Sequence, residues 1–391
     1  MKKFSSCFLF FLVTSSKLFA YPQNIAHGYT SCATCHVNPS GGGRTNAYGH
    51  LSLESLIPDK ANIISWMSNY REVKEKTAVT GYNKKREPEL QFNFGGSFRS
   101  LLLYQKNLDD KVANSLTLIP MLMEAQAYAL RGNFSIYGTF SILSINNRMG
   151  KRFIKPFSRE HWLMYQKDYM WFIRLGRMSL PFGIKTADHT RETRSLVNLH
   201  HSDQYYGFSL DYISEKFSFN FMPFIGNYLK YKPNQKSHEE KGAVLTFKLA
   251  KPTTFSIGLS SLFKRNERNY NELNHSINAT FQLPLHTYLL FEMVHQAKFE
   301  EKFQQKWASF LRVGKYFYEW IDAYGEFGEI RTENFKPYLI KVRLGLKGKF
   351  FPWLEVEPFV EYNLDKGEFF ETSPSPSLKK FIFAFQAHAY Y

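Results

Sequence analysis

From about residue 89 to the end of the chain, apolar and polar residues alternate one by one along short stretches. Phe134, Ile136 and Phe140 share one side of such a stretch, and Leu245 and Phe247 repeat the pattern further on. Successive side chains of a β-strand point to opposite faces, so a period of two indicates strands with one apolar face. A helix would instead need apolar residues every three to four positions. This part of the chain is therefore expected to be all-β.

The number and length of these stretches predict a transmembrane antiparallel barrel of about 16 strands. Connections alternate between short ones, such as Ser214-Glu215, and long polar ones, such as residues 231–241 and 365–377. Short periplasmic turns and long external loops are typical of outer-membrane barrels. An aromatic residue at the end of the last strand, Tyr391, is typical of their assembly signal. The expected strands start near residues 89, 115, 132, 159, 169, 205, 216, 242, 253, 272, 285, 306, 320, 337, 352 and 378.

Composition excludes several other classes. Aromatic residues make up 17% of the chain, enough to bury a large apolar surface, which argues against disorder. No apolar run reaches the length of about 18 residues that a transmembrane helix needs. Three Cys are too few for a disulfide scaffold. A soluble β-sandwich would also alternate, but it rarely has so many long strands with Phe and Tyr set so regularly opposite the charges.

The net charge of +16 does not indicate nucleic acid as a partner. No nucleic-acid-binding motif is visible, and an exported barrel does not meet nucleic acid. Basic loops beside an anionic lipid leaflet account for the charge.

In a barrel the apolar face meets lipid and the polar face lines the lumen. The strand over residues 337–347 would then set a basic row against the acidic row of residues 352–362, as a cross-strand ladder. We expect these charges mainly to pair and hydrate inside the lumen; the alternative is that they seat the N-terminal segment, residues 21–85, or set the path of ions. The residues placed there by parity are Arg174, Arg312, Asp322, Glu326, Lys341, Arg343, Glu355, Glu357 and Glu361.

Residues 180–203 form a long insert without alternation. Such an insert either folds into the lumen as a constriction or caps it from outside, and loops of this length are often functional. It contains His189, His200 and His201, for which a loop surface without a metal is the favoured interpretation.

The first 20 residues are predicted to be a secretory signal peptide. Lys2 and Lys3 precede a short apolar run, and Ala20 offers a small residue for cleavage before Tyr21. The alternative, a buried first helix, suits such a short apolar run less well.

Cys32-Ala-Thr-Cys35-His36 is the strongest motif in the sequence. Two Cys three residues apart and followed by His form the attachment motif of c-type haem. The two thiols would form thioethers to the porphyrin, and His36 would be the proximal iron ligand. A Cys32–Cys35 disulfide is one alternative. Another is a zinc site in which His27 or His50 completes the ligand set. Export favours haem, since c-type haem is attached outside the cytoplasm.

The distal iron ligand is predicted to be His27, with His50 as the second candidate and Met67 as the third. His27 lies five residues before Cys32, so the chain can pass round the porphyrin edge. The glycines of residues 41–43 would let the backbone approach a flat macrocycle, although an ordinary linker would also contain them.

Together, the CxxCH motif, Asn46-Ala47-Tyr48-Gly49 and the barrel pattern resemble the fused monohaem cytochrome–porin family. The resemblance implies a signal peptide over residues 1–20, a haem segment over 21–85 that plugs the lumen or its mouth, and a barrel over 86–391. Residues 38–43 depart from the pattern of the iron-oxidising members, so the resemblance implies the architecture more strongly than iron as a substrate.

The implied function is electron transfer across the outer membrane of a Gram-negative bacterium through one covalent haem c. Electrons would pass between an extracellular donor or acceptor and a periplasmic carrier such as a cytochrome c. The outer membrane and its lipopolysaccharide are the other expected partners. Such a chain would be an electron carrier rather than a typical enzyme, or else a metal oxidoreductase. The alternative is a passive porin whose haem segment serves assembly or sensing.

Overall fold

The structure, a computed structural model, describes the barrel strands and a short part of the N-terminal segment. The predicted signal peptide lies outside the described residues. The described residues are His36, Asn38, Pro39 and the ranges 90–108, 113–146, 152–167, 170–184, 191–199, 204–226, 240–251, 254–265, 270–300, 303–318, 320–332, 337–351, 354–365 and 378–390.

Seventeen strands in the described part form one antiparallel sheet. The strands are β1 (Gln91–Asn107), β2 (Ser115–Arg131), β3 (Phe134–Asn146), β4 (Arg152–Phe157), β5 (His161–Lys167), β6 (Trp171–Ser179), β7 (Gln204–Ile213), β8 (Phe217–Ile225), β9 (Lys241–Lys251), β10 (Phe255–Arg265), β11 (Asn271–Leu283), β12 (Thr287–Phe299), β13 (Phe303–Tyr318), β14 (Ile321–Arg331), β15 (Pro337–Phe351), β16 (Leu354–Asp365) and β17 (Leu378–Tyr390).

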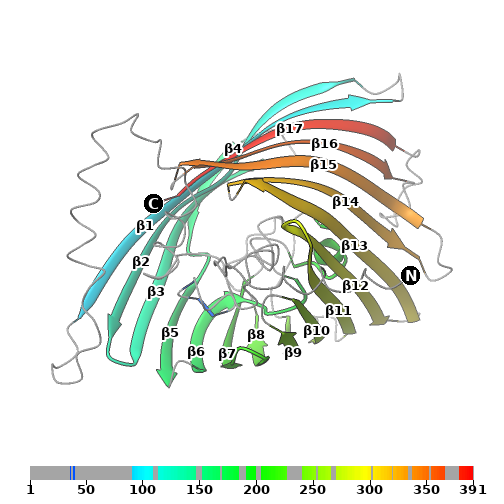
Figure 1. Cartoon of the computed structure of the whole chain (residues 1–391). Helices are drawn as coiled ribbons and strands as arrows, with labels where there is room; N and C mark the ends of the chain where they lie inside the picture. The colour runs from blue at the N-terminus through cyan, green and yellow to red at the C-terminus, as the bar shows by residue number, and fades with distance from the viewer. Residues whose placement is uncertain are drawn as a thin grey trace, which may run out of the picture.

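The sheet closes on itself, because β1 pairs with both β2 and β17 (Figure 1). β4 and β5 pair with successive parts of β3 and so form one wall strand that is interrupted at residues 158–160. The wall therefore has 16 strands, as the alternation predicts. Each predicted start lies within three residues of an observed one, and the start near residue 159 corresponds to β5 at His161. The prediction missed β4, with which the fourth wall strand begins at Arg152.

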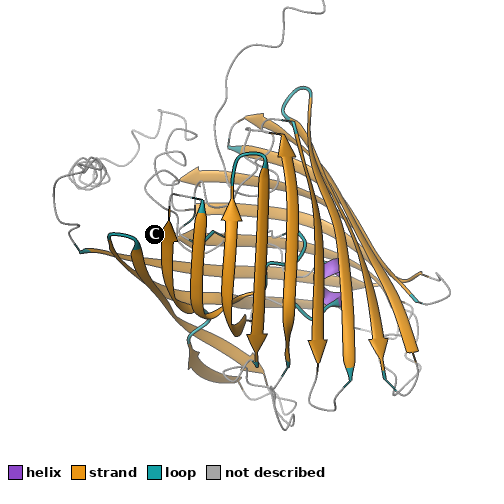
Figure 2. Ribbon diagram, turned by 90° about the horizontal axis from the view of Figure 1, so that it is seen from below, coloured by secondary structure: helices purple, strands orange, loops and turns teal. Residues whose placement is uncertain are grey.

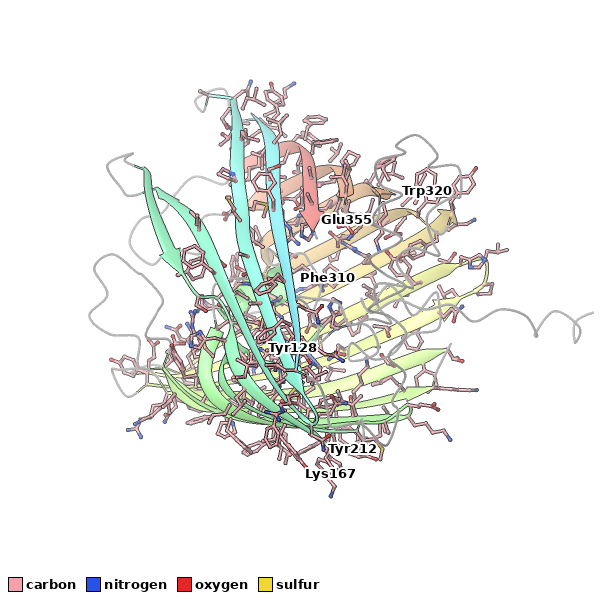
Figure 3. All side chains as sticks on the ribbon, turned by 90° about the vertical axis from the view of Figure 1, so that its left-hand side faces the viewer. Tyr128, Lys167, Tyr212, Phe310, Trp320 and Glu355 are labelled. Atoms are coloured by element: carbon pink, nitrogen blue, oxygen red, sulfur yellow. The ribbon has the colours of Figure 1, made fainter. Side chains whose placement is uncertain are left out.

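Side chains alternate between lipid and lumen as the sequence pattern predicts. Leu344 on β15 is 65% exposed on the outer face, whereas its neighbour Arg343 is buried on the inner face. Figure 3 shows Glu355 and Phe310 on the inner side of the wall. An apolar outer face with a polar inner face is what a lipid bilayer requires of a strand-built wall.

The predicted ladder between β15 and β16 is confirmed in part. Arg343 lies opposite Glu361 in the register, and Lys347 forms an ion pair with Glu355 at 2.8 Å. Lys341 differs, since its ion pair at 2.6 Å is with Glu192, in the long insert.

Connections at one end of the barrel have two or three residues, and those at the other end are mostly longer. The short ones are residues 132–133, 168–170, 214–216, 252–254, 284–286, 319–320 and 352–353. By the usual asymmetry of outer-membrane barrels, the short-turn end faces the periplasm. β1 begins and β17 ends at that same end, so the N-terminal segment joins the barrel from the periplasmic side.

One short helix, α3 (Glu192–Leu196), lies inside the wall within the insert between β6 and β7 (Figure 2). No helix among the described residues is long and apolar enough to span a membrane.

Candidate functional site

Of the residues predicted to hold haem, the structure describes His36. Its side chain is buried, as are those of Asn38 and Pro39, and Figure 1 draws these residues in blue inside the barrel near β6. The other predicted haem-site residues lie outside the described residues; they are Cys32, Cys35, His27, His50 and Met67.

Asn38 is bonded to the lumen wall through both ends of its side-chain amide. Its Nδ2 donates a hydrogen bond to Glu160 Oε2 at 3.2 Å, and its Oδ1 accepts one from Arg174 Nη1 at 2.6 Å. All three side chains are buried. Because buried polar groups need hydrogen-bond partners, these two bonds hold the Asn38 side chain in one orientation. The backbone two residues after His36 is thus held against the wall.

Arg174 is positioned by the two strands that follow it in the barrel. On β6 it points inward and lies opposite Ser209 of β7. Its Nε and Nη2 donate to the Asp211 carboxylate at 3.0 to 3.2 Å, and Nη2 also donates to Ser209 Oγ at 3.1 Å. Asn220 of β8 donates to both of these partners. A guanidinium can be fully buried only when it is neutralised in this way, and its planar fork leaves Nη1 directed at Asn38.

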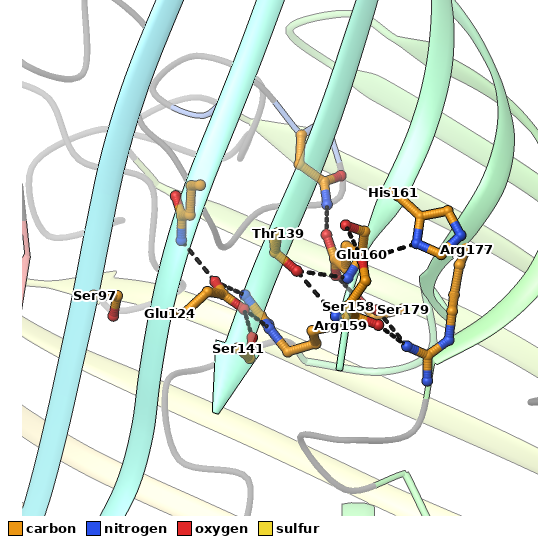
Figure 4. Close-up of polar contacts among 12 residues, drawn as sticks. Ser97, Glu124, Thr139, Ser141, Ser158, Arg159, Glu160, His161, Arg177 and Ser179 are labelled. Carbon is orange, nitrogen blue, oxygen red and sulfur yellow. Dashed lines mark hydrogen bonds and ion pairs between the residues drawn. The ribbon is translucent and has the colours of Figure 1, made fainter. Parts of the chain in front are cut away.

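Glu160 lies at the end of the interruption and points into the lumen, with the same parity as Trp162 and Met164 of β5. The backbone N–H groups of Arg159 and Glu160 both donate to Thr139 Oγ1 at 3.0 Å (Figure 4). Ser179 Oγ donates to Glu160 Oε1 at 2.6 Å, and Oε2 accepts from Asn38. The hydrogen bonds with Ser179 and Asn38 thus orient the carboxylate between the wall and the N-terminal segment.

Two arginines stabilise the interruption. Arg177 Nη1 donates to the backbone carbonyls of Ser158 and Arg159, within the interruption. Arg159 forms a two-point ion pair with Glu124 of β2, at 2.7 and 2.8 Å (Figure 4). Ser141 Oγ adds a hydrogen bond to the same carboxylate at 2.7 Å.

The insert after β6 folds into the lumen, so the structure selects the constriction over the external cap. Glu292 of β12 accepts hydrogen bonds from the backbone N–H of Ile184 and from Thr193 Oγ1, at 2.9 and 2.8 Å. Lys264 Nζ donates to the carbonyl of Val197 at 2.6 Å. The three His of the insert lie outside the described residues.

Beside the insert, a small cleft opens among paired charges. Arg343 contacts both Glu326 and Glu361, and Arg312 bonds Glu326 from the next strand. The lining residues are Arg191, Glu192, Phe310, Glu326, Gly328, Lys341 and Arg343. Three basic and two acidic side chains line the cleft, and Lys341 and Arg343 each form ion pairs with acids, as the predicted role of pairing inside the lumen requires.

Sequence reasoning missed Glu160 and the anchoring role of Asn38. Asn38 follows the CxxCH motif with no local pattern that links it to the wall, and Glu160 lies at the beginning of the strand predicted near residue 159. The described residues contain no group of three or more His, Cys, Asp or Glu that could hold a metal ion.

No family model and no curated protein matches the chain. Solved structures do match its fold. OmpT of Vibrio cholerae has a TM-score of 0.56 at 11% identity, covering 78% of this chain and 99% of that one. An anion-selective porin from Comamonas acidovorans has a TM-score of 0.54 at 8% identity, with coverages of 78% and 100%. OmpF of Salmonella typhi has a TM-score of 0.53 at 10% identity, with coverages of 77% and 98%.

The matched structures share the fold that the strand pairing of this chain defines. A closed antiparallel barrel with an apolar outer face and a polar lumen is how β-strands cross a bilayer, and in bacteria such barrels lie in the outer membrane. The chain is therefore a 16-stranded outer-membrane barrel with the porin-like fold.

Proposed function

We propose that this protein transfers electrons at the outer membrane through one covalent haem c. Cys32 and Cys35 would attach the haem, and His36 would be its proximal iron ligand, as the CxxCH motif predicts. The distal ligand would be His27 or His50. The haem, when bound, supplies reversible one-electron chemistry that no side chain of the barrel offers.

The observation that carries the proposal is that Asn38, two residues after the CxxCH motif, is held inside the barrel. The Asn38 side chain is fixed between Glu160 and Arg174, and His36 is buried two residues earlier. A buried imidazole suits an iron ligand, because burial is one way in which a protein tunes a haem potential. An ordinary flexible linker would gain nothing from such a contact.

The position of the anchor favours a periplasmic partner for electron exchange. Arg174 lies three residues after Trp171, where β6 leaves a short, periplasmic turn. The insert with α3 occupies the lumen against β12, β13 and β14. We propose a periplasmic cytochrome c or similar carrier as one partner and an extracellular donor or acceptor as the other, with lipopolysaccharide around the barrel. A metal ion oxidised or reduced outside the cell is one such extracellular substrate.

The experiment begins with the mass and absorption spectrum of the mature protein. A mass equal to that of the bare polypeptide, without c-type absorption, would overturn the proposal. Liposomes that enclose an oxidant are then supplied with an external, membrane-impermeant reductant. The wild type should transfer electrons, whereas Cys32→Ser/Cys35→Ser should insert without transferring them.

His36→Ala should retain the thioethers but lose the low-spin spectrum. The matched control is His286→Asn, which changes an exposed turn histidine whose positive φ asparagine also tolerates. Equal transfer by the haem-free protein would leave the second candidate, a passive porin. The porin-like fold and the paired lumen charges favour that candidate. Absence of transfer by any form would overturn the conduit and leave a haem that exchanges electrons with the periplasm alone.

A further inference from the structure

An apolar patch interrupts the polar lining of the lumen beside the Asn38 anchor. Tyr137 of β3, Trp162 and Met164 of β5 and Phe172 of β6 all point inward and are only 2% to 6% exposed. The rings of Tyr137 and Trp162 stack with centroids 5.0 Å apart. These four residues belong to a larger buried apolar cluster that also contains Leu180, Phe182 and Leu196 of the insert. Lumen faces of outer-membrane barrels are ordinarily polar, so this part of the wall differs in offering apolar contacts beside the anchor.

The patch and the anchor share the same strands. Met164 lies directly opposite Arg174 in the register between β5 and β6. Phe172 precedes Arg174 by one inward position, and Trp162 follows Glu160 by two residues. Inward positions on one strand are separated by about 6.8 Å, so the patch lies within one or two side-chain widths of the atoms that hold Asn38.

His36 belongs to the same neighbourhood through the chain. It precedes Asn38 by two residues, which span at most about 7 Å of backbone. A flat group attached at His36 and its neighbouring cysteines would therefore meet the wall at this patch. We propose that Tyr137, Trp162, Met164 and Phe172 form the seat against which the haem macrocycle packs. This inference rests on the proposed function and adds the part of the barrel that receives the haem.

The chemistry of the four side chains suits that role. Aromatic rings offer large flat apolar surfaces, and the unbranched thioether of methionine adapts to an irregular gap. Gly176, opposite Trp162 in the register, has a φ of +143°, and an added Cβ would lie 2.7 Å from the Cα of Trp162. Gly176 therefore lets the backbones of β5 and β6 approach each other closely beside Trp162. Apolar cover around a haem excludes water and favours its less charged, reduced form.

The test measures the haem itself rather than electron transfer. Phe172→Leu, Trp162→Phe and Met164→Gln are prepared as haem-loaded, full-length protein, and heat-modifiable migration confirms that each barrel has folded. The matched control is Phe310→Leu on β13. Phe310 is an equally buried inward aromatic residue, and it packs against Arg191 of the insert. The measurements are the reduction potential and the induced circular dichroism of the haem Soret band.

We expect each patch variant to lower the reduction potential and to change the Soret dichroism, with Phe310→Leu matching the wild type. Met164→Gln keeps the side-chain length and adds a polar amide, so it should shift the potential even where packing volume is conserved. Attached haem with the same potential and dichroism in all four variants would overturn the seat but leave the proposed function standing. Absence of attached haem in the wild type would instead overturn the proposed function, and the seat with it.

Discussion

Two regions of the lumen wall bury arginines, and they use them differently. On β13 to β16, the ion pairs run between neighbouring wall strands, as in Arg312 with Glu326 and Arg343 with Glu361. On β6, Arg174 is neutralised by Asp211 of the next strand but also donates to Asn38, from a segment 136 residues earlier. The first region ties the wall to itself, whereas the second ties the wall to the N-terminal segment.

The comparison teaches that burial of charge does not by itself identify a site. A buried ion pair is weak support for stability, because desolvation offsets much of the attraction. The informative difference lies in the partners. Glu160 divides its two oxygens between Ser179 of the wall and Asn38 of the segment, whereas both acids around Arg343 come from the wall.

The largest expected effect comes from removing the acid that neutralises Arg174. Asp211→Ala would leave a buried guanidinium without its two-oxygen partner, and breaking a buried pair in this way typically costs about 3–5 kcal/mol. We expect a large fall in the temperature at which the folded band disappears in heat-modifiability gels. Glu361→Ala is the comparison. Its loss of stability should be smaller, because Arg343 also contacts Glu326 at 3.4 Å and keeps one acidic partner. Equal losses would show that the two regions are energetically alike.

A charge placed on the lipid face should have the next largest effect. Leu344 points outward near the middle of β15, and Leu344→Lys should cost about 2–4 kcal/mol, the value for a cation at the bilayer midplane. Phe350→Lys is the control, since Phe350 points outward near the periplasmic end, where the cost falls to about 0–1 kcal/mol. Assembly yield and urea unfolding in detergent report both variants. Similar behaviour of the two would contradict the assigned faces.

Sequence periodicity predicted most of the wall because the bilayer imposes it residue by residue. Every outward position must be apolar, so β15 and β17 are visible before any contact is known. The prediction missed β4, the first part of the fourth wall strand. The stretch of β4 contains Lys155 and Pro156, and proline cannot donate to a ladder. The pattern therefore predicts a strand only from about residue 159, close to the start of β5 at His161.

The anchor could not be predicted for a different reason. Asn38 is separated from Glu160 by 122 residues and from Arg174 by 136, and no local pattern links such distant polar side chains. The insert posed the same difficulty. Its lack of alternation showed that it was not a strand, but only contacts such as that of Thr193 with Glu292 place it inside the lumen.

Loss of the anchor amide should have a smaller effect on the barrel and a specific effect on the segment. Asn38→Ala removes two buried hydrogen bonds and leaves Glu160 and Arg174 less satisfied, at a cost of about 1–3 kcal/mol. We expect barrel migration to persist while the N-terminal segment of the folded protein becomes more sensitive to protease. The control is Asn363→Ala on β16, because Asn363 also donates to a buried glutamate, Glu361, at 2.8 Å. Protease sensitivity that rises in both, or in neither, would contradict the anchor.

The smallest effect is expected from removing the hydrogen bond between Ser179 and Glu160, which supports the contact of Glu160 with Asn38. Ser179 Oγ donates to Glu160 Oε1. Losing a buried hydrogen bond to a charged group costs about 1.5–3 kcal/mol, and the cost should be lower here because Ser179 is only half-buried. Ser179→Ala should therefore leave the barrel folded and raise protease sensitivity of the segment slightly, since Glu160 becomes freer to turn from Asn38. Ser256→Ala is the matched control, because Ser256 bonds Thr280 at 2.7 Å between β10 and β11. If both serine variants lower barrel stability alike but only Ser179→Ala loosens the segment, the hydrogen bonds at Glu160 serve the docked chain as well as the wall.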